Sequence, residues 1–189
     1  MNPVTLLFVA LMLLWIGSEA VYDRRRSGDH KRTRDRGSLR LLHATLGGAG
    51  ALALLLAWLG IGRFGTEWRT PLLWLGCALM AAGLLLRAWS VRVLAEHFTV
   101  DVAIRPGHEL IRSGPYRLLR HPSYTGLLLT FLGFALALGS AWSLLLIAVV
   151  VTSALVWRIR VEEAVLRSAL PEAYPAYARE TKRLVPFLW

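Results

Sequence analysis

The chain has 189 residues, of which 56% are hydrophobic, and its formal net charge is +10. A soluble domain is about 45–50% apolar, so this composition favours a membrane protein over a soluble enzyme. The length fits one membrane domain, residues 1–189, with no room for a second large soluble domain. The basic residues lie between apolar runs, which favours contact with anionic membrane lipids and excludes nucleic acid as the expected partner.

The first apolar run, residues 6–21 extended back to Pro3, predicts a membrane-spanning helix. A bilayer core requires about 20 apolar residues per helix. No Lys or Arg precedes this run, and three arginines, residues 24–26, follow it. A signal peptide has the opposite charge order, so we expect a retained span. Residues 23–40 are strongly basic and predict a solvated loop.

Two further spans are predicted in the first half of the chain. Residues 41–61 form the second, and the three glycines within residues 47–50 indicate close helix contact there. The third span is expected to begin at Pro71 and to run to about residue 93, because proline suits the first turn of a helix. Arg87 lies late in this span and either snorkels to the interface or lines an internal site.

The second half combines a polar segment with a helical hairpin. Residues 95–123 are polar and aromatic, with three proline-containing turns that interrupt regular helix. Residues 124–157 are apolar, and Gly139-Ser140 divides them into a fourth and a fifth span. The tail from Arg158 predicts an amphipathic helix. The fold class is therefore an all-α polytopic membrane bundle with about five transmembrane helices, a hairpin of spans 4–5 and a C-terminal amphipathic helix.

Orientation follows from the basic loops. The loop of residues 23–40 should be cytoplasmic, which places the N-terminus outside. Five crossings then bring residues 95–123 and the C-terminal tail to the cytoplasmic face together. The chain divides accordingly into three spans, residues 1–94, and a site-bearing part, residues 95–189. We expect this arrangement in a plasma membrane of bacterial type.

Two polar clusters flank the predicted hairpin. The first, residues 108–124, holds two histidines and two tyrosines beside tight turns, which is typical either of an interfacial loop or of a ligand site. In the second cluster, Arg158 and Glu162 are four residues apart and share a helical face, as a surface ion pair or as part of a site. Tyr174 and Tyr177 either cap a ligand or anchor the tail to the interface, and we favour the anchor.

Several familiar sites are missing from the sequence. There is no G-x-G-x-x-G after a strand, no P-loop and no G-x-S-x-G motif. Cys77 is the only cysteine, and no Cys/His spacing suits a metal, so no metal site is expected. Cys77 is expected to be a small packed side chain. Any cofactor must then bind to the bundle and its cytoplasmic loops.

At these clusters the sequence resembles the isoprenylcysteine carboxyl methyltransferase family of membrane enzymes. The resemblance covers about residues 101–186. It is carried by Ser113-Gly114-Pro115-Tyr116, Arg120-His121-Pro122-Ser123-Tyr124, Gly126, Arg158, Glu162-Glu163, Leu166, Tyr174, Tyr177 and Pro186.

The resemblance implies S-adenosyl-L-methionine as the cofactor and a lipophilic small molecule or lipid as the acceptor. The cofactor residues that it implies are Asp101, His108, Leu110, Ile111, Tyr116, His121, Pro122, Ser123, Tyr124 and Glu162. Arg158 is implied to bind the acceptor, and the candidate catalytic residues are Arg158, Glu162 and His121. A carboxylate acceptor would need no general base, whereas for an amine or thiol acceptor His121 is the candidate base.

Two other functions remain open at this point. Membrane sterol reductases resemble the family in the same region and bind NADPH, although they are generally longer. A non-enzymatic membrane protein with structural motifs is the other alternative. Comparing the binding of S-adenosylmethionine with the binding of NADPH would distinguish a methyltransferase from a reductase.

Overall fold

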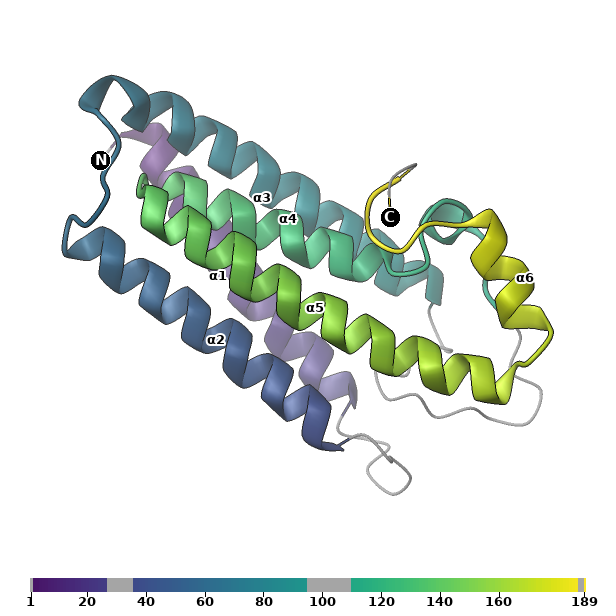
Figure 1. The fold of residues 1–189 in the computed structure, drawn as a ribbon. Coiled ribbons are helices and arrows are strands. Elements are labelled where there is room, and N and C mark those ends of the chain that lie inside the picture. The colour runs from purple at the N-terminus through teal and green to yellow at the C-terminus, as the bar shows by residue number, and fades with distance from the viewer. Residues whose placement is uncertain (1, 27–35, 95–109, 187–188) are drawn as a thin grey trace.

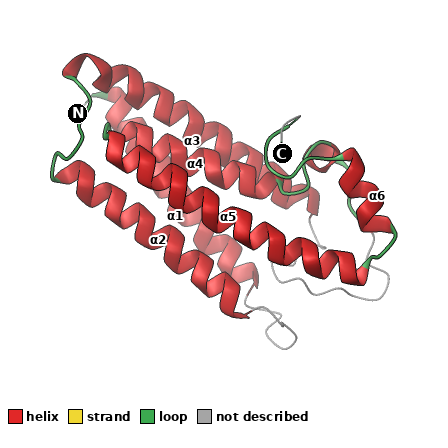
Figure 2. Cartoon of the chain, viewed as in Figure 1, coloured by secondary structure: helices red, strands yellow, loops and turns green. Residues whose placement is uncertain are grey.

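A computed structural model describes residues 2–26, 36–94, 110–186 and 189, and the side chains of residues 23–26 and 36–37 are left aside. Helices dominate this part of the chain, and no β-strand occurs in it (Figure 2). The helices are α1 Pro3–Arg26, α2 Arg36–Trp58, α3 Thr66–Leu94, the 3₁₀ helix η3 Gly114–Arg117, α4 Pro122–Ala137, α5 Ala141–Ala169 and α6 Ala173–Glu180. The predicted all-α fold is confirmed.

The long helices lie side by side in one bundle, and α6 with the tail packs beside one end of it (Figure 1). Helices α1, α2, α3 and α5 are long and apolar enough to cross a membrane, and α4 is a shorter apolar helix of 16 residues. The polytopic helical bundle that we expected is therefore confirmed, although α4 is shorter than a typical span. The protein is an integral membrane protein.

The predicted hairpin is present. Helix α4 ends at Ala137, α5 begins at Ala141, and Gly139 in the turn has φ +69°, a conformation that residues with a side chain rarely adopt. Ser140 caps α5 by accepting a hydrogen bond from the Ser143 backbone N–H at 3.2 Å. At this end of the bundle, Ser143 Oγ also donates to the Ala53 carbonyl oxygen at 2.7 Å, which links α5 to α2.

Helix α3 begins earlier than predicted. It starts at Thr66, and Pro71 lies inside it rather than at its first position. The residue before a proline is biased away from helix, so the sequence favoured a turn through Thr70. In the structure, Pro71 is in the second turn, where it removes the hydrogen bond to the Glu67 carbonyl but does not end the helix.

The closest helix contact joins α3 to α4, not α2 to a neighbour. A Cβ atom added to Gly76 would lie 2.5 Å from the Gly133 carbonyl oxygen, and one added to Gly83 would lie 2.5 Å from that of Gly126. By contrast, a Cβ on Gly47 or Gly48 would meet nothing within 4 Å. A Cβ on Gly50 would lie 3.7 Å from Phe131 Cε1, an ordinary contact distance, so the glycines of residues 47–50 do not make the close backbone contact. Helical glycines permit such contact only on the face that meets another helix.

Candidate functional site

The loop before α4 is fixed against the end of α3. Gly114 has φ +56°, and a Cβ at this position would lie 2.9 Å from Val93 Cγ2. The next residues form η3, where Pro115 and Tyr116 are buried. Burial raises the pKa of the Tyr116 phenol, and its hydroxyl lies 3.5 Å from the Ser90 carbonyl oxygen. Tyr116 is therefore a neutral packed group rather than a base.

The tail pairs with the same loop through its backbone. The Arg120 N–H donates to the Lys182 carbonyl at 2.7 Å, and the His121 N–H donates to the Arg183 carbonyl at 3.1 Å. The Lys182 N–H donates back to the Leu118 carbonyl at 3.0 Å. These bonds form a short parallel ladder, so the residues after α6 determine where the start of α4 lies.

The tyrosines of α6 are buried in this contact. Tyr174 is 1% exposed and Tyr177 is 4% exposed, and the Tyr177 hydroxyl donates to the Tyr116 carbonyl oxygen at 2.7 Å. Burial raises the pKa of Tyr177 to about 12. The predicted interfacial anchor is therefore wrong, because both rings pack into the protein instead of facing lipid headgroups.

His121 stands at the N-cap position of α4 and faces two consecutive carboxylates of α5. Its side chain is 7% exposed. Nδ1 lies 3.6 Å from Glu162 Oε2, and Nε2 lies 3.6 Å from Glu163 Oε1. Nε2 is buried without a hydrogen-bond partner in the described part of the chain. The ring also stacks on Tyr124, with centroids 5.8 Å apart.

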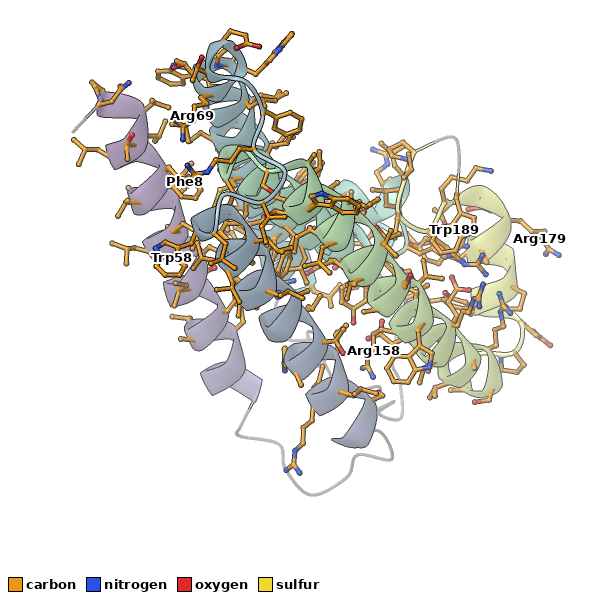
Figure 3. All side chains as sticks on the ribbon, turned by 60° about the vertical axis from the view of Figure 1, so that its left-hand side comes forward. Phe8, Trp58, Arg69, Arg158, Arg179 and Trp189 are labelled. Carbon is orange, nitrogen blue, oxygen red and sulfur yellow. The ribbon has the colours of Figure 1, made fainter. Side chains whose placement is uncertain are left out.

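Arg158 and Glu162 form the centre of the site. Arg158 is fully buried, and its Nε donates to Glu162 Oε1 at 3.0 Å. The Tyr124 hydroxyl donates to the same oxygen at 2.5 Å, and Arg158 Nη1 donates to Ser38 Oγ of α2. Figure 3 shows Arg158 between α2 and α5. The predicted i,i+4 pair is therefore confirmed as a buried pair, not a surface one.

Glu163, the next residue, has a different role. It is 2% exposed and accepts hydrogen bonds from Arg120 Nε at 2.9 Å, Arg167 Nη2 at 3.1 Å and Arg183 Nη2 at 2.9 Å. These arginines come from the loop, from α5 and from the tail. Charge-assisted bonds of this kind are stronger than neutral ones, so Glu163 holds the three segments together beside His121.

The expected site residues are thus only partly brought together. His121, Tyr124 and Arg158 each contact Glu162, and Pro122 is buried as the first residue of α4. Ser123 faces Arg87, and Tyr116 faces the tail. Leu110 and Ile111 are half-buried at the start of the described loop, and Asp101 and His108 lie outside the described residues.

Sequence reasoning missed Ser38 and Arg183, which touch this site; it gave Arg120 only as part of the family motif and Arg87 only as one of two alternatives. Arg120 and Arg183 could have been suggested by Glu163, because a glutamate buried on a helix needs cationic partners. Ser38 carries no such signal, since an isolated serine at the start of a span has many possible partners. The described residues include no group of three His, Cys, Asp or Glu that could hold a metal ion.

The chemistry of the four contacting side chains suits a polar, partly cationic cofactor. Glu162 supplies a carboxylate, Arg158 a buried cation, and Tyr124 an aromatic ring and a hydroxyl. Nε2 of His121 lies 3.6 Å from Glu163 Oε1 but makes no hydrogen bond in the described part of the chain, and burying a polar atom without a hydrogen bond is costly. The residues present therefore offer groups that a cofactor of this kind could contact.

Comparison with known proteins agrees with this geometry. The family model described as phospholipid methyltransferase matches residues 71–173, more than half of the chain. Protein-S-isoprenylcysteine O-methyltransferase B of Arabidopsis thaliana is 32% identical over 115 residues, 60% of this chain and 58% of that protein. The protein-S-isoprenylcysteine O-methyltransferase of Schizosaccharomyces pombe is 31% identical over 111 residues, 58% of this chain and 47% of that protein.

A third relative carries a different name. The cobalt-zinc-cadmium resistance protein CzcN of Cupriavidus metallidurans is 34% identical over 137 residues, 68% of this chain and 56% of that protein. The chain thus spans about half the length of these curated relatives. The family resemblance expected from the two clusters is confirmed, and the chain belongs to the phospholipid methyltransferase family of membrane proteins, which includes the isoprenylcysteine methyltransferases.

Proposed function

We propose that the protein is a membrane methyltransferase that transfers a methyl group from S-adenosyl-L-methionine to a lipophilic acceptor at the cytoplasmic face. The observation that carries this proposal is the hydrogen-bonded set of Tyr124, Glu162 and Arg158, with His121 beside it. It joins both predicted clusters in a chain that belongs to a family of methyltransferases.

Each site residue would contact a different group of the cofactor. When bound, the cofactor supplies a methyl group on a positively charged sulfur. The Glu162 carboxylate would favour cationic and hydroxyl groups of the cofactor, and the His121 ring would offer Nε2, which makes no hydrogen bond in the described part of the chain. The neighbouring aromatic face of Tyr124 suits a cation.

Arg158 would orient the acceptor. Its guanidinium is fully buried, so an anionic or strongly polar group of the acceptor would be bound strongly there. Methyl transfer depends mainly on holding two groups in line, so positioning by Arg158 and Glu162 would carry most of the effect. A carboxylate acceptor requires no proton transfer, whereas an amine or thiol would use His121 as the base.

The depth of the site suits an acceptor dissolved in lipid. Helix α4 has 16 residues, which span about 24 Å, less than the roughly 30 Å core of a bilayer. Its N-terminal end, with His121 and Tyr124, would then lie near the boundary between hydrocarbon and headgroups. A lipophilic acceptor could reach Arg158 sideways from the membrane, while the cofactor arrives from the cytoplasm.

Cofactor binding is the first test. Calorimetry of the purified protein in detergent should show saturable binding of S-adenosylmethionine and none of NADPH. Glu162→Gln keeps the shape of the side chain and removes its charge, so it should weaken binding roughly tenfold or more. The matched control is Glu172→Gln, because Glu172 is exposed at the start of α6. Absence of binding in a folded sample, or preference for NADPH, would overturn the proposal.

The acceptor is the second test. Relatives are named for isoprenylcysteine and the family for phospholipid, so one assay should offer both a prenylcysteine carboxylate and phosphatidylethanolamine with a labelled methyl donor. Arg158→Gln should abolish transfer and weaken cofactor binding much less, through the lost bond to Glu162. Equal loss of methyl transfer and of cofactor binding would show that Arg158 is not specific to the acceptor.

The cytoplasmic location can be tested with the existing cysteine as background. Cys77 is buried, so a cysteine introduced by Glu172→Cys should dominate labelling by a membrane-impermeant maleimide. Labelling in inside-out vesicles alone would support the proposed orientation. Labelling in right-side-out vesicles alone would reverse it.

A further inference from the structure

A second, partly buried ion pair joins α3 to α1. Arg87 of α3 faces Glu19 of α1, with Nε 2.8 Å from Oε1 and Nη2 donating to Oε2 at 2.8 Å. The Arg87 side chain is 11% exposed and that of Glu19 is 29% exposed. Of the two roles expected for Arg87, the structure favours an internal contact over snorkelling to the interface. One charge-assisted hydrogen bond, from Nη2 to Oε2, and the close charge contact between Nε and Oε1 hold the two side chains together.

The remaining arm of Arg87 reaches α4. Nη1 donates to Ser123 Oγ at 3.0 Å and approaches the Ser123 carbonyl at 3.4 Å. Close approach of the helices permits this contact, because a Cβ on Gly126 would lie 2.8 Å from the Arg87 backbone nitrogen. The guanidinium also lies 5.3 Å from the centroid of the Tyr22 ring on α1. One arginine thus connects α1, α3 and α4.

Ser123 is adjacent in sequence to both halves of the candidate site. Tyr124, whose hydroxyl donates to Glu162, follows it directly, and His121 lies two residues before it. All three residues belong to the first turn of α4, where the Tyr124 N–H donates to the His121 carbonyl at 3.0 Å. A shift of Ser123 must therefore move Tyr124 and His121 with it.

We propose that Glu19 and Arg87 are positioning residues that hold the first turn of α4 in register for cofactor binding. Glu19 holds the guanidinium, the guanidinium holds Ser123, and Ser123 sets the position of the Tyr124 and His121 side chains. The link to the cofactor rests on the proposed function. It makes α1 part of the site, although α1 lies outside the matched region of residues 71–173. Ionisable side chains within a membrane bundle are energetically costly, which favours a functional role for this pair.

The competing explanation is that the pair only attaches α1 to the bundle. Both explanations predict lower thermal stability when one partner is removed, because a buried charge loses its counterion. They differ in what happens at the first turn of α4, about a hundred residues away from Glu19 in sequence.

The experiment compares Glu19→Gln and Arg87→Lys with a control variant, Ser143→Ala. Ser143→Ala removes the hydrogen bond to the Ala53 carbonyl at the other end of the bundle and should lower the melting temperature without touching Ser123. We expect both test variants to weaken S-adenosylmethionine binding about 2- to 30-fold. They should also accelerate hydrogen exchange in peptides covering residues 118–126. Ser143→Ala should change neither the affinity for S-adenosylmethionine nor the hydrogen exchange at residues 118–126.

A double variant separates stability from positioning. Glu19→Gln combined with Arg87→Met removes both charges, so much of the lost thermal stability should return. The contact with Ser123 stays absent, so cofactor affinity should remain low and exchange at residues 118–126 should remain fast. Recovery of affinity together with stability would overturn the proposal, and so would unchanged exchange in Glu19→Gln and Arg87→Lys.

Failure of the proposed function would be visible separately. If the wild-type protein does not bind S-adenosylmethionine, the methyltransferase proposal fails by itself. The exchange measurement uses no cofactor and still decides whether Glu19 and Arg87 control the first turn of α4.

Discussion

Two contacts in this protein achieve tight packing by opposite means. Helices α3 and α4 meet through Gly76, Gly83, Gly126 and Gly133, where the two backbones approach so closely that no side chain fits. At the other contact, α5 meets the tail through Glu163 and its arginine partners, in which charged groups supply the attraction. The first contact depends on glycines and the second on charged side chains.

The difference reflects what surrounds each contact. Lipid tails are as apolar as the helices, so α3 and α4 gain little from hydrophobic burial and rely on close van der Waals contact. The contact between α5 and the tail lies at the end of the bundle, where charged side chains can be satisfied by one another and by water. Each contact should therefore fail under a different substitution.

The largest expected effect comes from filling the glycine contact. Gly83→Val places a Cβ 2.5 Å from the Gly126 carbonyl oxygen, which a rigid backbone cannot accommodate. We expect a loss of more than about 3 kcal/mol, sufficient to abolish folded protein in detergent, measured by size-exclusion chromatography and thermal unfolding. Gly47→Val is the matched control, because the same change meets nothing within 4 Å there. Equal behaviour of the two variants would refute the close contact.

An intermediate effect is expected from removing the charge of Glu163. Glu163→Gln leaves three arginines around a neutral amide, at a cost of about 3 kcal/mol because the glutamate is 2% exposed. The bundle should stay folded while the tail detaches, seen as faster hydrogen exchange at residues 181–184. Arg167→Gln should cost much less, since that side chain is 52% exposed. Hydrogen exchange at residues 181–184 as slow as in wild type would contradict the role of Glu163 in holding the tail.

The smallest effect is expected at the surface of the same tail. Glu180 lies 3.5 Å from Arg112, and the two side chains are 67% and 45% exposed. Glu180→Gln should change the free energy of unfolding by less than about 0.5 kcal/mol, because water screens exposed pairs. Thermal unfolding at low and high salt checks this, and a shift approaching that of Glu163→Gln would mean that burial does not decide the strength of these pairs.

Local features of the fold were predictable from the sequence. The hairpin follows from a largely apolar stretch of 34 residues divided by Gly139-Ser140, and the pairing of Arg158 with Glu162 follows from their spacing of four. The contact between the two polar clusters followed from the expected topology. These features depend on neighbouring residues or on the number of crossings, both of which can be read along the chain.

Features set by distant contacts were not predictable. The glycines of α3 and α4 are ordinary in sequence, and only the rotation of the two helices places them opposite each other. Glu19 and Arg87 are separated by 68 positions and give no periodic signal. Burial of Tyr174 and Tyr177 depends on the path of the tail, which two prolines leave undetermined in the sequence.

The ladder between the tail and residues 118–121 also sets an order of events during synthesis. The helices through α5 leave the ribosome before Lys182 and Arg183 do, and they can enter the membrane in turn. The start of α4 acquires its backbone partners only when those last residues emerge. Assembly of the site is therefore a late, post-insertion step, and a nascent chain stalled before Lys182 would hold a bundle without a completed site.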